Sequence, residues 1–236
     1  MTFDASYFEE APNYPDRYKY DAIRRAINQE YHALLIKKIM NRKKVRILDV
    51  GCGFGYFLKT CDENNWETYG VDFQYALSVA KQFTRAQLLC QSAEEPLPVS
   101  DDFFDIVTTF NLIEHLKNPL EFSKEAFRIL RPQGMFVIET PNTQGIGKLM
   151  FQKNWTGFLD KTHINLFSPK TLKAMLLKTG FTRIRLETRG LPYHPKMRPS
   201  RTRVKRRTLV AITAKMYKMF RLPLGLGDHI FAYCFK

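Results

Sequence analysis

The chain has few cysteines and no long hydrophobic segment. Its four cysteines are scattered without the close spacing of a zinc site, and we expect them to be reduced thiols. No apolar run approaches the roughly 20 residues that cross a bilayer. The opening MTFDASYFEE is acidic and lacks the apolar centre of a signal peptide. These absences predict a cytoplasmic protein.

Acidic residues are scarce as well. The 236 residues include 37 Lys and Arg but only 23 Asp and Glu, a formal net charge of +14. Ten of the cations lie in 196–221, which has no acidic residue, so the excess is local. Apolar residues at helical spacing predict a basic amphipathic helix over 207–221. Its role is open between a solvated cover of the core, docking on an anionic membrane at its inner face, and nucleic-acid binding, which no recognised module supports.

The most informative motif is VRILDVGCGFGYF at 45–57. Its β-branched and apolar start predicts a strand buried on both faces, and the glycines permit a tight turn into a helix that begins near Tyr56. The GxGxG spacing differs from the GxGxxG of a dinucleotide-binding turn. The carboxylate of Asp49 would repel a pyrophosphate there, but it suits a cationic amino-acid moiety.

A second carboxylate follows the next predicted strand. The segment WETYGV at 66–71 ends on Asp72, which is 23 positions after Asp49. An acidic residue at this place in nucleotide-binding α/β folds binds ribose hydroxyls. Two carboxylates at the carboxyl ends of neighbouring parallel strands indicate a ligand rather than packing.

Five phrases together resemble the class I S-adenosylmethionine (SAM) methyltransferases, and within them the subgroup that includes the ubiquinone-biosynthesis O-methyltransferases. They are LDVGCGFG, GVD, FDIVTTFNLIEHLKNP, LRPQGMFVIETPN and HINLFSPKTLKAMLLKTGF, within about 45–181. The resemblance implies a Rossmann-like seven-stranded sheet of order 3-2-1-4-5-7-6 with strand 7 antiparallel, SAM as cofactor and S-adenosylhomocysteine (SAH) as product. Alternating strand and helix patterns independently predict a doubly wound α/β domain with helices on both faces.

The resemblance also implies which residues hold the cofactor. Asp72 is expected at the ribose, and the SAEEPLP segment is expected at the adenine ring. The family often has Asp in place of Ser92, so backbone or Glu94 is expected to contact the adenine. The predicted cofactor residues are Asp49, Gly51, Cys52, Gly53, Asp72, Phe73, Ser92, Ala93, Glu94 and Asn111.

Local signals place the remaining elements. Asn118 and Glu121 are expected to cap a helix with Pro119 at its first position, and Ser168 and Gly180 bracket another helix. Further strands are predicted at 86–90, 103–110, 182–187 and 230–235.

One SAM-binding domain, 45–236, is expected to carry a cap at its ligand edge. The cap would comprise a helical N-terminal segment 1–44, a substrate loop 141–167 and the basic insertion 188–229 between strands 6 and 7. Aromatic residues in these pieces suit an acceptor with a ring or a lipid tail. For any single one of them, packing the cap onto the domain is the more expected role. They include Trp155, Phe158, Phe167 and Tyr193.

Two histidines are the candidate catalytic residues. Methyl transfer from a sulfonium is an in-line displacement, so the protein must chiefly align the acceptor and exclude water. A base is needed only when the acceptor must lose a proton, and the histidine pKa suits this task. His115 and His163 both lie in loops expected at the ligand edge, where a purely structural hydrogen bond is the alternative role.

A metal site is expected to be absent. Some relatives, the small-RNA 2′-O-methyltransferases and certain quinone O-methyltransferases, place a divalent metal on an ExxEH phrase and a later histidine. This chain reads NLIEH, so Glu114, His115 and His163 match but Asn111 replaces a carboxylate. That loss weakens the case for Mg²⁺, which prefers oxygen anions.

The preferred function is methyl transfer to oxygen of a small or lipid-linked acceptor, such as a quinone precursor, a glycan or another metabolite. Two alternatives stay open: an RNA methyltransferase that uses the basic insertion, and a SAM-binding protein without catalysis. The sequence does not define the oligomeric state.

Overall fold

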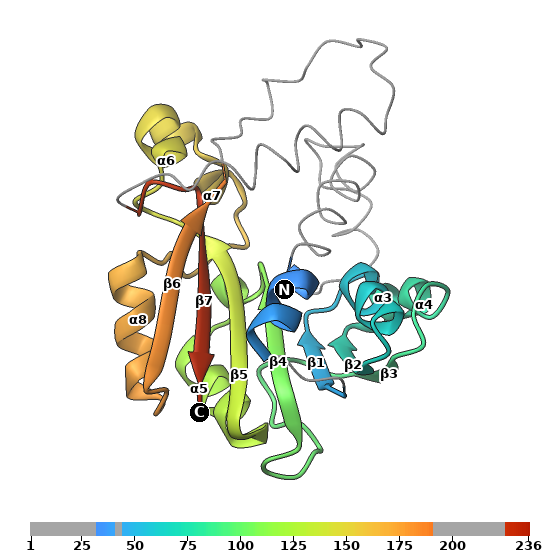
Figure 1. The fold of residues 1–236 in the computed structure, drawn as a ribbon. Coiled ribbons are helices and arrows are strands. Elements are labelled where there is room, and N and C mark those ends of the chain that lie inside the picture. The colour runs from blue at the N-terminus through green and yellow to red at the C-terminus, as the bar shows by residue number, and fades with distance from the viewer. Residues whose placement is uncertain (1–31, 41–43, 191–224) are drawn as a thin grey trace. The chain divides into compact units, whose positions relative to one another are not determined.

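A computed structural model describes residues 32–40, 44–190 and 225–236. Seven strands follow the order β3-β2-β1-β4-β5-β7-β6 in one sheet flanked by helices (Figure 1), as predicted. Most of two predicted cap pieces, including 207–221 and Tyr193, lies outside the described residues. The chain divides into two compact units, 1–97 and 98–236, and each is described by itself.

The first unit is built on three parallel strands, β1 (Arg46–Val50), β2 (Glu67–Asp72) and β3 (Gln87–Cys90). A helix at 32–40 precedes them. Helices α3 (Tyr56–Glu63) and α4 (Gln74–Ala80) follow β1 and β2 and pack against this part of the sheet. The strand bounds agree with the sequence prediction to within one residue, because short β-branched runs bounded by turns leave little ambiguity.

Asp62 joins three parts of this unit. Its buried carboxylate accepts hydrogen bonds from Thr68 Oγ1 (2.6 Å), Thr84 Oγ1 (2.6 Å) and the backbone N–H of Arg85 (2.8 Å). These bonds link the end of α3 to β2 and to the chain that enters β3. A charged acceptor with three donors offsets its burial, so this aspartate has a structural role.

The second unit contains β4 (Phe104–Phe110), β5 (Leu130–Pro141), β6 (Arg183–Arg189) and β7 (His229–Phe235). Strand β4 is parallel to β5, and β7 runs antiparallel between β5 and β6 (Figure 1). Six of the seven residues of β4 are buried, as expected for a central parallel strand covered on both faces.

The helices α5 (Pro119–Ile129) and α8 (Pro169–Lys178) of the second unit begin where the capping residues of the sequence predict. Ser168 and Thr171 form a reciprocal capping box at the start of α8. Helix α5 begins at Pro119 with Asn118 at the N-cap position, as predicted, although the Asn118 side chain makes no capping hydrogen bond. Among the described residues, no helix is both long and apolar enough for a bilayer span. The helices are η1 (Ile113–His115), α5 (Pro119–Ile129), α6 (Ile146–Phe151), η2 (Gln152–Asn154), α7 (Thr156–Leu159) and α8 (Pro169–Lys178).

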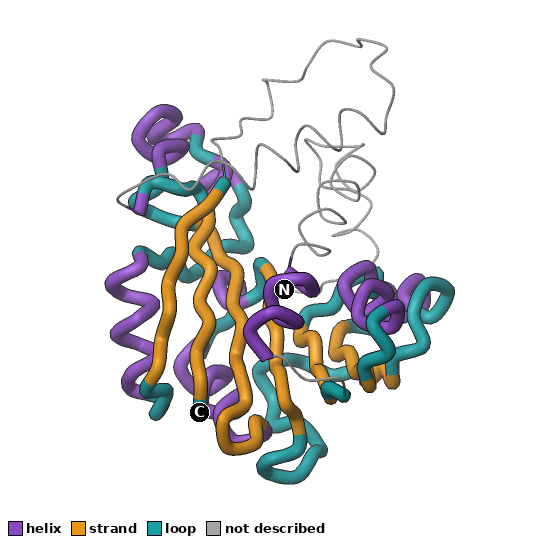
Figure 2. The backbone as a smooth tube through the Cα atoms, in the orientation of Figure 1, coloured by secondary structure: helices purple, strands orange, loops and turns teal. Residues whose placement is uncertain are grey.

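The segment after β5 is held by the chain that enters β7. Asn142 Nδ2 donates to the carbonyl oxygens of Gly225 (2.8 Å) and Gly227 (2.7 Å), and the N–H of Gly147 donates to Asp228 Oδ1 (2.7 Å). Figure 2 shows the short helices α6 and α7 beyond the carboxyl end of β5. The predicted substrate loop 141–167 is therefore a structured element with its own anchor.

The four cysteines differ in exposure. Cys52, Cys61 and Cys234 are buried, and only Cys90 is exposed. Burial raises the pKa of all three buried thiols, and the charge of Asp49 adds to the rise at Cys52 and Cys61. Because the thiolate is the reactive form, these thiols should be inert in the native protein.

We expect Ellman's reagent to modify one thiol of the native protein and all four after unfolding in guanidinium chloride. Replacement of the exposed thiol, Cys90→Ser, should remove the native reaction and leave three reactive thiols in the unfolded chain. Rapid reaction of more than one native thiol would contradict the described core.

Candidate active site

A left-handed glycine turn follows β1. Gly51, Gly53 and Gly55 have φ values of 75°, 53° and 74°, which L side chains rarely adopt. A Cβ on Gly55 would lie 3.1 Å from the side chains of Ala80 and Thr84, whereas a Cβ on Gly53 would meet no atom within 4 Å. The turn thus packs tightly on one side and leaves open space beside Gly53, where a ligand can contact the backbone.

Asp72 holds this turn to the end of β2. Its Oδ2 accepts the N–H of Gly53 (2.7 Å), and its Oδ1 accepts the N–H of Phe73 (2.7 Å). Burial raises the carboxyl pKa, and the two N–H groups oppose the rise. Each oxygen keeps a further lone pair, so the carboxylate can also accept a bond from a ribose hydroxyl.

The other predicted cofactor residues of the first unit have distinct environments. Asp49 is buried one residue before the end of β1. The Cys52 thiol packs with Leu58 and Leu77 and lies 3.9 Å from the carbonyl oxygen of Gly53 in the turn. Phe73 is exposed directly after Asp72.

The predicted adenine segment forms a local turn. Ser92 Oγ accepts the N–H of Glu94 (3.2 Å), and the Ser92 carbonyl accepts the N–H of Glu95 (3.2 Å). Ala93 lies within this turn. The Ser92 side chain therefore shapes the backbone, which fits an adenine contact made by main-chain atoms.

Asn111, the remaining predicted cofactor residue, belongs to the second unit and follows β4. It adopts a left-handed φ of 53°, and its N–H donates to the carbonyl of Glu139 (2.8 Å). Asparagine tolerates this conformation better than most residues, so Asn111 has a backbone reason to be there besides any ligand contact.

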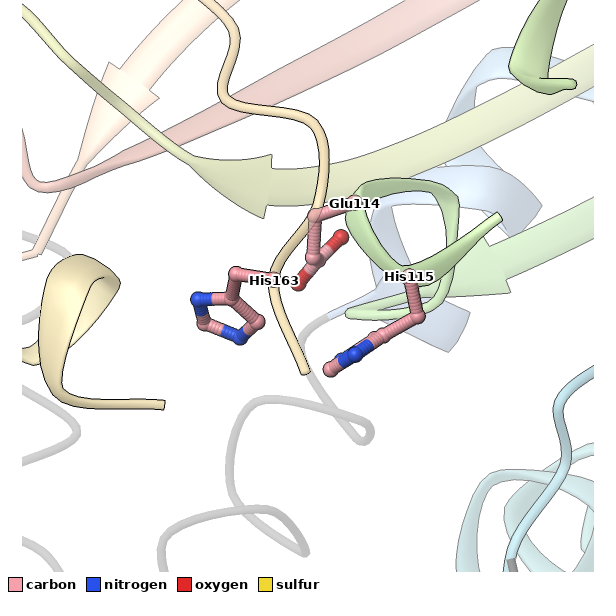
Figure 3. A group of neighbouring side chains, drawn as sticks. All are labelled: Glu114, His115 and His163. Carbon is pink, nitrogen blue, oxygen red and sulfur yellow. The ribbon is translucent and has the colours of Figure 1, made fainter. Parts of the chain in front are cut away.

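A second cluster of polar groups lies within the second unit. Glu114 and His115 come from η1, and His163 comes from the chain after α7 (Figure 3). Their candidate ligand atoms all lie within 4.8 Å of one another, and the two imidazole rings meet edge to face with centroids 4.7 Å apart. The structure thus brings together the two predicted catalytic histidines.

Glu114 is fully buried. Its Oε2 accepts a bond from Thr140 Oγ1 (2.9 Å), whereas Oε1 has no hydrogen-bond partner among the described residues. Burial is the main cause that raises the pKa of this carboxyl to about 8, while its hydrogen bonds act in the opposite direction. The carboxyl is therefore largely protonated at neutral pH in the absence of a cation.

His115 is oriented by a short relay. Its Nδ1 lies 2.9 Å from Thr162 Oγ1 and 3.1 Å from the Thr162 carbonyl oxygen. The threonine hydroxyl donates its hydrogen to Asp160 Oδ1 (2.6 Å), so both atoms that face Nδ1 are acceptors. We therefore assign the proton of neutral His115 to Nδ1, which leaves the lone pair on Nε2.

His163 has the same tautomer for a similar reason. Its Nδ1 lies 2.9 Å from the carbonyl oxygen of Gly157, which can only accept. Its Nε2 lies 3.7 Å from Asp160 Oδ2, so a carboxylate faces this edge of the ring. Both imidazoles use Nδ1 to hold the loop, so Nε2 carries the lone pair of each neutral ring.

Sequence reasoning missed three members of this environment. Thr140 contacts the buried carboxyl, and Asp160 and Thr162 orient the histidines. The DKTH phrase around His163 was the available signal, because a carboxylate and a hydroxyl beside a histidine often fix its tautomer.

The predicted aromatic acceptor residues divide into two groups. Trp155 and Phe167 are buried and pack the loop, whereas Phe158 is exposed with Lys148 Nζ 5.8 Å from its ring centroid. Further exposed apolar side chains of the same loop are Leu149, Met150, Leu159 and Ile164.

A family model described as a methyltransferase domain matches residues 18–186. The chain belongs to the class I SAM-dependent methyltransferases. This family takes its methyl group from SAM and releases SAH. The glycine turn, Asp72 and the space beside Gly53 fit that cofactor.

Similar proteins agree with the family. A probable SAM-dependent methyltransferase of Mycolicibacterium smegmatis is 29% identical over 64% of this chain and 57% of its own length. A demethylmenaquinone methyltransferase of Staphylococcus aureus is 29% identical over 72% of this chain and 83% of its own length. The chain spans about three fifths of the length of the first of these curated relatives.

A solved structure shows the same fold. The SAM-dependent methyltransferase from Archaeoglobus fulgidus superposes with a TM-score of 0.62 at 21% identity, covering 88% of this chain and 94% of that protein.

We expect Asp72→Ala to weaken SAH binding about 10- to 100-fold, because it removes a charged acceptor from two N–H groups and from the ribose. Isothermal titration calorimetry measures the loss, and Glu63→Ala, which removes an exposed acid at the end of α3 in the same unit, is the matched control. Unchanged affinity in a folded Asp72→Ala protein would refute the ribose assignment.

The raised pKa of Glu114 predicts a pH-dependent stability. The native carboxyl keeps its proton up to about pH 8, whereas the unfolded carboxyl loses it near 4.5, so native stability falls as pH rises through this window. Glu114→Gln has no such loss. In urea unfolding with EDTA, the variant should therefore gain stability relative to the natural protein between pH 5 and pH 9. A difference that does not change with pH would show that burial of Glu114 carries no such penalty.

Proposed function

We propose that the protein transfers the methyl group of SAM to an oxygen atom of a small or lipid-linked acceptor. The glycine turn with Asp49 and Asp72 binds the donor, and the cluster of Glu114, His115 and His163 lies at the acceptor. Membrane contact through 207–221 stays part of this prediction.

The observation that carries the proposal is the common orientation of the two imidazoles. An alkyl or sugar hydroxyl must lose its proton during methyl transfer, whereas a neutral amine needs no base before attack. His115 and His163 each direct Nδ1–H to an oxygen of the protein, so in the neutral rings Nε2 is the basic atom. Two basic atoms in one cluster favour an acceptor with an acidic hydrogen on oxygen.

The apolar surface of the loop supports an acceptor with a ring or an alkyl tail. Phe158, Leu159 and Ile164 are exposed and lie close in sequence to His163. Exposed apolar side chains of this kind bind apolar ligands at little cost in free energy. The Staphylococcus aureus relative is named for a menaquinone precursor, which is an acceptor of this kind. We therefore favour a quinone precursor over a glycan.

SAH release should be measured with a panel of phenols, quinols, sugars and RNA. Turnover with a hydroxyl acceptor supports the proposal, and turnover with RNA alone overturns it in favour of the RNA alternative. Binding of SAM with no turnover on any acceptor would identify a SAM-binding protein without catalysis.

We expect His163→Ala to lower the rate of methyl transfer by about 10²- to 10⁴-fold, the usual contribution of a general base, and to change the affinity for SAM little. His229→Gln, a histidine of the same unit outside the cluster, is the control and should keep full turnover. Equal losses of turnover and SAM affinity would assign His163 a role in folding the loop.

A further inference from the structure

One carboxylate lies close to both histidines of the cluster. Asp160 Oδ1 accepts the hydroxyl hydrogen of Thr162 (2.6 Å) and also the backbone N–H of that residue (3.0 Å). The same hydroxyl oxygen lies 2.9 Å from His115 Nδ1. The second carboxylate oxygen, Oδ2, lies 3.7 Å from His163 Nε2. Each oxygen of Asp160 therefore faces a different imidazole, one through a hydroxyl and the other through space.

The loop geometry holds the His163 ring in front of this carboxylate. The ring Nδ1 lies 2.9 Å from the carbonyl oxygen of Gly157, and the backbone N–H of His163 donates to the carbonyl of Asp160 (3.1 Å). A Cβ on Gly157 would collide with the indole of buried Trp155, so close packing on the indole sets the position of this carbonyl. The ring is thus held between a carbonyl at Nδ1 and a carboxylate at Nε2.

The contact between Asp160 and His163 favours the charged form of the ring. In the neutral ring, Nε2 and the carboxylate oxygen are both acceptors, so no hydrogen bond joins them and the lone pair stays available. Once Nε2 carries a proton, the imidazolium faces a carboxylate within ion-pair distance. Both side chains are only 11% exposed, so water and salt screen this attraction weakly. The geometry therefore stabilises the protonated ring without occupying the basic atom of the neutral one.

Asp160 carries the negative charge beside the two imidazoles. Burial raises the pKa of Glu114 to about 8, and the charges of Glu139 in β5 and of Asp160 add to the rise, so Glu114 keeps its proton at neutral pH. The two donors of Thr162 instead stabilise the charge of Asp160. The imidazole centroids are 4.7 Å apart, so one carboxylate compensates one proton and repulsion opposes a second.

We propose that Asp160 is the charge partner of protonated His163 and, through Thr162, the group that orients His115. In the proposed reaction the acceptor O–H bond breaks, its proton passes to Nε2 of His163, and the oxygen takes the methyl group as the C–S bond of SAM breaks. The positive charge of the sulfonium thereby moves to the imidazole, and Asp160 stabilises it until the proton leaves to water. A fixed carboxylate beside the charge that forms favours this step. Asp160 is thus a positioning residue that acts through the two imidazoles.

The inference rests on the proposed function for its reaction step, but the charge pair itself needs no acceptor. The test is a pH titration of the histidine side chains by NMR spectroscopy, on the full chain labelled with ¹⁵N in its histidines. The His163 signals are assigned by their loss in His163→Gln. Asp160→Asn decides the test, because the amide oxygen can still accept both hydrogen bonds of Thr162 while the charge is lost. Asp101→Asn, which changes an aspartate of the same unit that pairs with Arg128, is the matched control.

We expect the His163 imidazole to titrate at lower pH in Asp160→Asn than in the natural protein, with a proton affinity about 10-fold lower. The sign follows from the charge: the carboxylate favours the imidazolium, so its removal favours the neutral ring. Asp101→Asn should titrate like the natural protein. An unchanged His163 titration in Asp160→Asn that is folded by circular dichroism would overturn the proposal.

Thr162 separates the roles of the two carboxylate oxygens. Thr162→Val removes the hydroxyl but keeps the N–H that donates to Asp160. The variant should change the ¹⁵N shifts and the titration of His115 and leave the titration of His163 close to the natural one. Thr162→Ser, which keeps the hydroxyl, should restore His115. Equal changes at the two histidines in Thr162→Val would show that Asp160 only holds the loop, and would refute its separate roles.

The rate of methyl transfer provides a second measurement. Asp160→Asn should move the acid limb of the pH–rate profile to lower pH and lower the rate at high pH, because a weaker base removes the proton more slowly. Its affinity for SAH should stay unchanged. A loss of rate without movement of the acid limb would assign Asp160 a purely structural role.

The two proposals fail in different ways. Turnover of a hydroxyl acceptor by the natural protein, together with an unchanged His163 titration in Asp160→Asn, would refute the charge pair and leave the O-methyl transfer intact. A lowered His163 titration in Asp160→Asn, without turnover on any hydroxyl acceptor, would support the charge pair and refute only the proposed function.

Discussion

The glycine turn after β1 depends on two hydrogen bonds to one carboxylate. Strands β1 and β2 pair with Val50 opposite Val71, so Asp72 extends one residue beyond the last residue of β1. From there it reaches the N–H groups of Gly53 and Phe73 at 2.7 Å each. A residue shift in this pairing would turn the carboxylate to the opposite face. The parallel register therefore positions the glycine turn. The conformation of this turn leaves the open space beside the backbone of Gly53.

The cluster of Glu114, His115 and His163 depends on backbone contacts rather than on its own side chains. The carbonyl oxygen of Glu114 accepts the N–H groups of Ile164 (3.0 Å) and Asn165 (2.9 Å), which attaches the loop after α7 to η1. His163 is carried next to the glutamate by this attachment. The geometry of the three side chains thus follows from how one loop docks on one short turn.

This difference explains what the sequence could predict. The strand bounds, the glycine turn and the start of α8 are local patterns, and the structure agrees with them. The bond from Thr162 to His115 spans 47 residues, and the bond from Asn142 to Gly227 spans 85. No local periodicity encodes such pairs, so the relay, the loop anchor and the burial of Glu114 were missed. The Cys52 thiol faces the core because a glycine at position 70 leaves room for it, which is also a contact between distant residues.

The charge balance of the cluster of Glu114, His115 and His163 depends on its burial. Two carboxylates, Glu114 and Asp160, lie beside two imidazoles in a largely buried place, where an isolated negative charge is costly. Without a cation, the balance is kept by a proton on Glu114, as its raised pKa indicates. Burial of Glu114 therefore sets its protonation state, and Asp160 is the carboxylate that faces His163 Nε2.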